Sequence, residues 1–123
     1  WMHAAEADYT NFFRDLTQEE RPQGKLYDDK TFEAWYVRWQ ERLAQDENDM
    51  KASLTLMGAN NPVVIPRNHK VEEALDAATN GDLQPLRDLL VAVETPYENH
   101  DDLIPYQSPP KPEEKVLQTF CGT

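Results

Sequence analysis

A chain of 123 residues with a formal net charge of −11 is long enough for one domain with a modest core. The acidic balance excludes a nucleic-acid partner, because binding to phosphates relies on clustered Lys and Arg. No apolar run approaches the roughly 18 residues of a membrane span, no signal-peptide pattern is present, and a single cysteine excludes an internal disulfide framework and fits a reducing compartment.

The chain opens on Trp1, within a stretch that already has helical periodicity. Without an initiator Met we expect a piece of a longer polypeptide, and a processed start is the alternative. The first predicted helix has an aromatic face, which we interpret as core packing. Residues 17–30 are polar and contain Pro22 and Gly24, so we predict a loop there and the best candidate for disorder. The apolar positions of the first helix are Ala5, Tyr9, Phe12, Phe13 and Leu16.

A second helix is predicted over residues 31–44, with the largest aromatic surface in the sequence. We interpret this surface as core, and an aromatic cage or an exposed docking face is the alternative. A third helix is predicted over residues 46–57, with Gly58 as its stop and Asn61 biased toward extended backbone because Pro62 follows. The apolar positions of the second helix are Phe32, Trp35, Tyr36, Trp39 and Leu43.

Residues 61–97 organise the chain as an extended stretch, a helix, an Asn-Gly break, a second helix and a stop at Pro96-Tyr97. Asn68 is placed to cap the first of these helices, Gly81 to close it in a left-handed conformation, and Asp82 to cap the next. Two such helices should pack as an antiparallel pair with their apolar stripes facing inward. The stripes are Val71, Ala74, Leu75 and Ala78, then Leu83, Leu86, Leu89, Leu90 and Val93.

From residue 98 onward the pattern changes, because prolines forbid a continuous helix and favour extended backbone or turns. We predict an extended strap that lies across the helices or across the rest of a parent protein. Residues 109–112 match PxxP, so a ligand for an aromatic groove is the alternative. Residues 113–120 could add a helical turn or a short strand. The prolines concerned are Pro105, Pro109, Pro110 and Pro112.

The chemically active groups form no recognisable site. The four scattered glycines make neither a P-loop nor a dinucleotide-binding turn, and the histidines lie too far apart for a zinc site. The adjacent acidic residues can simply be solvated. No His and Asp lie at a spacing from the serines that indicates a Ser-His-Asp catalytic arrangement. We therefore predict no catalytic residue, no metal site and no cofactor within this chain. The groups considered are His3, His69, His100, Glu72, Glu73, Asp101, Asp102, Ser53 and Ser108.

Two side chains need separate comment. The guanidinium of Arg67 could fork onto a carboxylate or a carbonyl at the start of a helix, and we favour this structural role. Cys121 lies three residues from the end; a buried small hydrophobe is the ordinary role of a free cysteine, and an accessible thiol that exchanges with another thiol is the alternative.

One long block has a specific pattern, carried by Asn61-Pro62, Ile65-Pro66-Arg67-Asn68-His69, Glu72-Glu73-Ala74-Leu75, Gly81-Asp82 and Pro96-Tyr97. This block resembles the C-terminal region of the selenoprotein O family. Residues 7–14, Ala-Asp-Tyr-Thr-Asn-Phe-Phe-Arg, resemble an earlier helix of that region, and residues 119–123 resemble the family terminus that bears cysteine or selenocysteine. The resemblance covers nearly the whole chain but only the last part of a full-length member.

The resemblance implies a parent with a protein-kinase-like fold that binds ATP in a flipped orientation. Such a parent transfers AMP to Ser, Thr or Tyr hydroxyls of protein substrates and uses a divalent metal such as Mg²⁺. The family's nucleotide- and metal-binding residues lie upstream, so none is carried onto this chain. Cys121 matches the family position that can pair with an upstream cysteine as a redox switch, and this chain has no second cysteine. A bacterial-type parent implies the cytoplasm and a eukaryotic one the mitochondrion.

We thus expect an all-α fold: a small bundle of about five helices over residues 1–104 and a Pro-rich extended tail over residues 105–123. The expected role is non-catalytic support of an upstream kinase-like domain of the same polypeptide. A helical protein-interaction module that uses the aromatic face or the PxxP tail is the alternative. An independent enzyme is a third class, and it would require nucleotide turnover by these residues alone.

Overall fold

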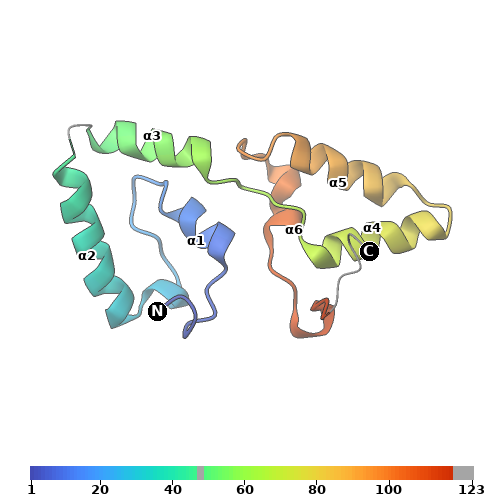
Figure 1. Ribbon diagram of the computed structural model, residues 1–123, viewed down its shortest axis with the longest axis horizontal. Helices are drawn as coiled ribbons and strands as arrows, with labels where there is room; N and C mark the ends of the chain where they lie inside the picture. Colours follow the sequence, from blue (N-terminus) through green and yellow to red (C-terminus); the bar gives the residue numbers. More distant parts are fainter. Residues whose placement is uncertain (47–48, 118–123) are drawn as a thin grey trace. The chain divides into compact units, whose positions relative to one another are not determined.

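The structure, a computed structural model, describes residues 1–46 and 49–117. In these residues it contains six α-helices, three short 3-10 helices and no strand, so the all-α prediction is confirmed (Figure 1). The chain divides into two compact units, Trp1–Pro62 and Val63–Thr123. The predicted boundary between residues 104 and 105 stays a prediction.

The first unit contains α1 (Tyr9–Asp15), α2 (Lys30–Ala44) and α3 (Met50–Asn60). Each helix follows an aspartate whose carboxylate accepts hydrogen bonds from backbone N–H groups of the first turn, which otherwise have no helical partner. The bonds run to Asp8 from Asn11 N at 2.9 Å, to Asp29 from Thr31 N at 2.7 Å and Phe32 N at 3.0 Å, and to Asp49 from Ala52 N at 2.7 Å.

The first helix is shorter than predicted. It begins at Tyr9 and leaves Ala5 outside, because Glu6 adopts a positive φ of 49° and the cap, Asp8, follows it. Left-handed backbone at a residue with a Cβ interrupts a right-handed helix.

The third helix also differs from the prediction at both ends. It begins at Met50 rather than at residue 46, because Asp49 is its cap, and it runs through Gly58 to Asn60. The predicted stop at Gly58 is therefore wrong. The chain straightens one residue before Pro62, at Asn61, which has φ −111° and ψ 111° as expected of a residue that precedes proline.

The core of the first unit is aromatic, and the interpretation of the α2 aromatics as core is confirmed for Phe32 and Tyr36, which are both buried. Trp35 and Trp39 are half-buried against the same cluster. The segment before α2 is a loop as predicted, but the expectation of disorder does not hold. Its short 3-10 helix, Lys25–Tyr27, places the Tyr27 ring 5.0 Å from the Phe32 ring, because a large aromatic side chain gains most by burial.

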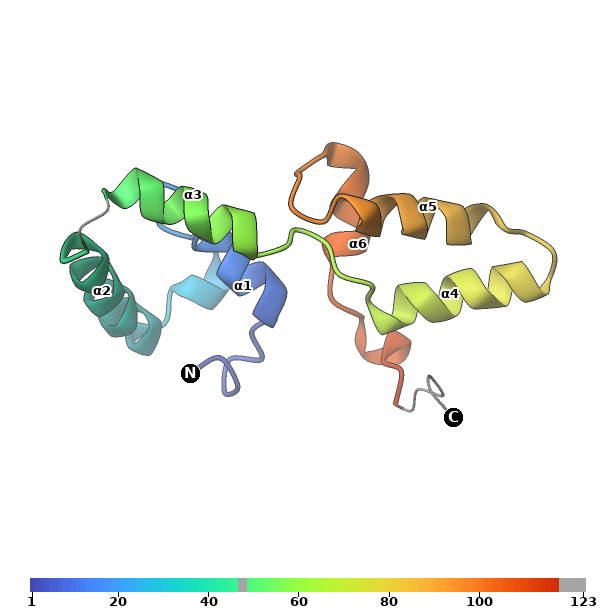
Figure 2. The ribbon, with the colours of Figure 1, turned by 45° about the horizontal axis from the view of Figure 1, so that its top comes forward.

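The second unit is built on α4 (Asn68–Thr79) and α5 (Gln84–Glu94), which lie side by side and run antiparallel, as predicted (Figures 1 and 2). A 3-10 turn at Asp101–Leu103, the short α6 (Ile104–Gln107) and a 3-10 turn at Pro112–Glu114 complete the unit. Its core cluster consists of Val63, Val64, Ala92 and Leu103, with Val93 and Tyr106 packed against it.

The prediction that both hairpin stripes face inward is only partly right. Ala74 and Leu89 are buried, whereas Leu75 is 47% exposed and Leu90 is 51% exposed. Two helices in contact bury a single line of side chains each, and a stripe wider than that line needs another neighbour to cover it.

Two further details correct the predictions. Asn68 is the first residue of α4 rather than its cap; the preceding residue, Arg67, takes the cap position without a side-chain cap hydrogen bond. The tail is also less extended than predicted, because Pro105 lies in the first turn of α6 and Pro112 in that of the last 3-10 turn. Proline is tolerated there, since the N–H it lacks would have no helical partner.

Candidate functional site

The two ends of the predicted structural motif, just after Pro62 and at Pro96, meet at the base of the α4–α5 hairpin. The carbonyl of Pro96 accepts from Val63 N at 2.6 Å and from Val64 N at 3.4 Å, so the backbone just after Asn61-Pro62 lies against the backbone just before Tyr97. The structure thereby brings the two ends of the 61–97 block together. Tyr97 itself is exposed.

Arg67 holds the second unit together from inside. Its side chain is 8% exposed, and Nη2 donates to the carbonyl of Gln107 at 2.7 Å. The predicted bond to a carbonyl is present. The acceptor, however, is at the last residue of α6, forty residues along the chain, and not at the start of a helix. A charge-assisted hydrogen bond from a guanidinium to a backbone carbonyl positions the segment that carries the carbonyl.

Gly81 and Asp82 shape the tip of the hairpin. Gly81 has φ +91°, and the N–H groups of Gly81 and Asp82 donate to Ala78 O at 3.0 Å and to Ala77 O at 2.9 Å, the pair of bonds that defines a Schellman motif. The carboxylate of Asp82 then accepts from Gln84 N at 3.0 Å, at the first residue of α5. Gly81 closes α4 as predicted, whereas the cap position of α5 is Leu83 rather than the predicted Asp82, which lies one residue earlier and bonds the first N–H of the helix.

Sequence reasoning missed two anchoring contacts in the first unit. Arg14 Nη1 donates to Gly58 O at 3.1 Å and to Asn61 O at 3.2 Å, and burial lowers its pKa. The Tyr27 hydroxyl donates to the Asp15 carboxylate, and burial, with that bond and charge, raises the pKa of Tyr27. Neither contact has a local sequence signal, because the partners lie 44, 47 and 12 residues apart.

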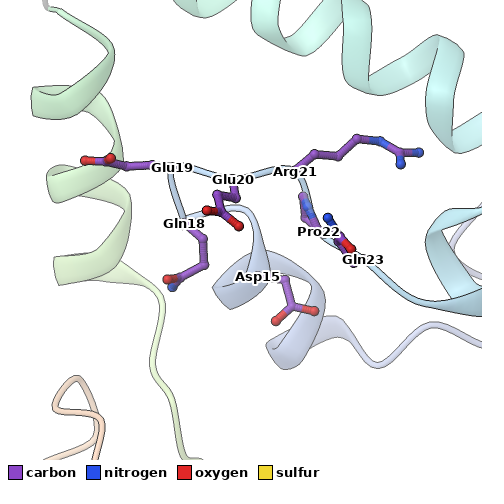
Figure 3. Close-up of a pocket in the computed structure, with 7 residues that line it drawn as sticks. All are labelled: Asp15, Gln18, Glu19, Glu20, Arg21, Pro22 and Gln23. Atoms are coloured by element: carbon purple, nitrogen blue, oxygen red, sulfur yellow. The ribbon is translucent and has the colours of Figure 1, made fainter.

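The loop after α1 borders an open hollow of about 530 Å³ (Figure 3). Figure 3 shows the Arg21 side chain extending away from Asp15 and Glu20. Its Nη2 donates to Tyr27 O at 2.8 Å, and its guanidinium lies 5.5 Å from the centre of the Phe32 ring. The lining holds no Ser, Cys or His, so no nucleophile with a neighbouring base is found in this hollow. The lining residues are Asp15, Gln18, Glu19, Glu20, Arg21, Pro22 and Gln23.

The remaining predicted features are dispersed. In the described ranges, no group of three or more His, Cys, Asp and Glu side chains could hold a metal ion. His100 Nε2 lies 3.2 Å from the Glu98 carboxylate, an exposed pair remote in sequence from His69. Among residues 1–46 and 49–117, none of the helices is both long and apolar enough to span a membrane. Cys121 lies outside the described residues.

Comparison with known proteins identifies a family, which the contacts described above do not. Residues 1–94 match the family model described as protein adenylyltransferase SelO. Three bacterial relatives named protein nucleotidyltransferase YdiU are similar along the chain. Those of Nitrosococcus oceani and Alcanivorax borkumensis are each 49% identical over 100% of this chain, which covers 25% and 26% of their lengths. That of Bacillus thuringiensis is 45% identical over 99% of this chain and 25% of its own length. The chain thus spans about a quarter of the length of these relatives.

Proposed function

Because this chain belongs to the protein adenylyltransferase SelO family, we propose that it is a non-catalytic helical region of a longer nucleotidyltransferase. In this proposal it is the C-terminal region, and a kinase-like domain upstream in the same polypeptide transfers AMP from ATP to Ser, Thr or Tyr hydroxyls of protein substrates. The present residues support that domain. The observation that carries the proposal is a match along the whole chain to relatives about four times as long.

The contacts described above are consistent with a supporting role. Arg14 and Arg67 use their guanidinium groups on backbone carbonyls, where they fix segments in place. In this proposal ATP and Mg²⁺ are bound by the upstream domain, and no step passes through a group bound here.

Two finer points belong to the same proposal. Cys121 would serve as a redox-sensitive thiol that pairs with an upstream cysteine of the longer protein. The compartment would be the bacterial cytoplasm, in line with the bacterial sources of the relatives.

The test is truncation of the full-length protein before Asn61. We expect loss of AMP transfer to a protein substrate or a lower melting temperature, because the packing of the second unit is removed. The full-length protein with Arg42→Met, a change at an exposed position, is the matched control. A truncated protein that keeps both its melting temperature and its AMP transfer would contradict the proposal.

An interaction module is the second candidate, and one observation favours it. An apolar groove of about 540 Å³ in the first unit is lined in part by Trp1, Phe13 and Trp35. A partner seated there would shift tryptophan emission on binding. Emission that is already blue-shifted and unchanged by added protein extract would leave the supporting role as the only candidate.

A further inference from the structure

Helix α3 has a composition unlike that of a surface helix. Its eleven residues, MKASLTLMGAN, include Lys51 as their one charged side chain, whereas α2 carries five charged residues in fifteen: Lys30, Glu33, Arg38, Glu41 and Arg42. A helix with few charged residues and apolar side chains on more than one face is normally covered on more than one side. In this acidic chain, where 28% of residues are charged, such a helix needs an explanation.

Only one side of α3 is covered in the first unit. Ser53 and Leu54 are buried, and Met57 packs on the aromatic cluster. Figure 1 shows α1 and α2 on one side of α3 and no element of the first unit on the other.

The opposite side is an exposed apolar stripe, which we call the α3 outer face: Ala52, Thr55, Leu56 and Ala59. These residues have the spacing i, i+3, i+4 and i+7 of a single helix face, and Leu56 is 63% exposed. The face lines a shallow hollow of about 540 Å³, with Asp49 and Lys51 at its edge.

The polar groups of this face are already bonded within the helix. Thr55 Oγ1 donates to Lys51 O at 2.8 Å, and the neighbouring Asn60 Nδ2 donates to Leu56 O at 2.8 Å. Burying a polar group costs free energy mainly when its hydrogen bonds are lost. The α3 outer face can therefore be covered by apolar side chains without leaving these groups unpaired.

We propose that the α3 outer face docks onto an apolar surface of the remaining polypeptide of the full-length protein. This inference rests on the proposed function and adds the surface through which the support acts. The relatives contain about three quarters of their length outside this match, which supplies an occupant in the same molecule. A second copy is a poorer occupant, because two chains of net charge −11 repel one another.

The test measures access to this face in both contexts. With Cys121 and every cysteine of the upstream polypeptide replaced by serine, Ala59→Cys places a single thiol on the α3 outer face. Glu41→Cys places one on the exposed, charged side of α2 as the control. We expect maleimide to modify Ala59→Cys at least about tenfold more slowly in the full-length protein than in the 123-residue chain, because modification then requires local opening. The Glu41→Cys thiol should react at similar rates in both.

Equal rates for Ala59→Cys in the two proteins would overturn the docking. Protection of Ala59→Cys from maleimide in the 123-residue chain itself would also overturn the docking. Protection that increases with protein concentration would indicate a second copy as the occupant. In the full-length protein Leu56→Glu should lower the melting temperature, and it should leave that of the 123-residue chain unchanged.

These outcomes separate the two proposals. If Ala59→Cys is accessible in the full-length protein and truncation abolishes AMP transfer, the docking proposal is wrong and the supporting role stands. If Ala59→Cys is protected in the full-length protein and truncation before Asn61 changes neither AMP transfer nor the melting temperature, the docking surface stands and residues 61–123 have no supporting role.

Discussion

The guanidinium of Arg14 joins α1 to the end of α3 through two backbone carbonyls, those of Gly58 and Asn61. We expect Arg14→Met to lower the free energy of unfolding of the chain by about 2 kcal/mol, since Met keeps the apolar stem but leaves both carbonyls without this charged donor. Urea unfolding followed by circular dichroism measures the change.

Arg42→Met is the matched control for that substitution. The Arg42 side chain is exposed and its Nη1 lies 4.0 Å from Asp46 Oδ1, so we expect a loss below about 0.5 kcal/mol. Equal effects at the two positions would show that the Arg14 bonds add nothing to stability.

The pKa of Tyr27 is raised by burial and by the Asp15 carboxylate that its hydroxyl bonds. A raised pKa means that the fold favours the neutral phenol. The resulting stability is complete below the ordinary tyrosine pKa of about 10 and is lost as pH rises above it. We expect the free energy of unfolding to fall as pH rises above about 10, and to fall less steeply in Tyr27→Phe.

Tyr36 and Tyr106, whose pKa values are also raised by burial, will leave a residual alkaline slope in that variant. Identical slopes in the two proteins would mean that Tyr27 titrates as it does in the unfolded chain.

Among single elements, the tip of the α4–α5 hairpin offers a comparison of two glycines. Gly81 has φ +91°, so Gly81→Ala should lower the free energy of unfolding by about 1–2 kcal/mol through backbone strain. Gly58 lies inside α3, where a Cβ would meet Arg14 Nη1 at an ordinary 3.8 Å, so Gly58→Ala should raise it by about 0.5–1 kcal/mol. Urea unfolding checks both, and the same sign at both sites would contradict the assigned backbone roles.

Local patterns predicted the helices well where the signal is local. Gly81 and Asp82 act within a few residues of themselves, and the period of α2 is unbroken. The errors arose where a distant or competing group decided the outcome. α3 begins later than predicted because Asp49 is its cap. The Leu90 side of α5 is exposed because an apolar stripe shows which side of a helix can be buried but not which neighbour covers it.

For the whole molecule, the two units each have a buried cluster of their own. All three tryptophans, Trp1, Trp35 and Trp39, belong to the first unit, so their emission reports on it alone, while circular dichroism reports on helices in both. We expect Gly81→Ala to shift the urea midpoint measured by circular dichroism and to leave the tryptophan midpoint unchanged. A common shift would show that the units unfold as one cooperative body.

At this scale the sequence predicted the family and the all-α class, both of which are shown. The anchoring residues were harder to predict. The acceptor of Arg67 was unpredictable because Gln107 O is a backbone group forty residues away, which carries no side-chain signature. Arg14 was missed for the same reason.

The hydrogen bonds from Val63 N and Val64 N to Pro96 O fasten the two legs of the hairpin at its base. Because the start and the end of the hairpin are bonded to each other, residues can be added or removed at its tip without moving the point where the chain leaves the hairpin. The turn around Gly81 is therefore the natural place to splice in a foreign peptide, such as an epitope or a fluorophore-binding tag. Whole helical turns could be added or removed there while the rest of the unit keeps its register.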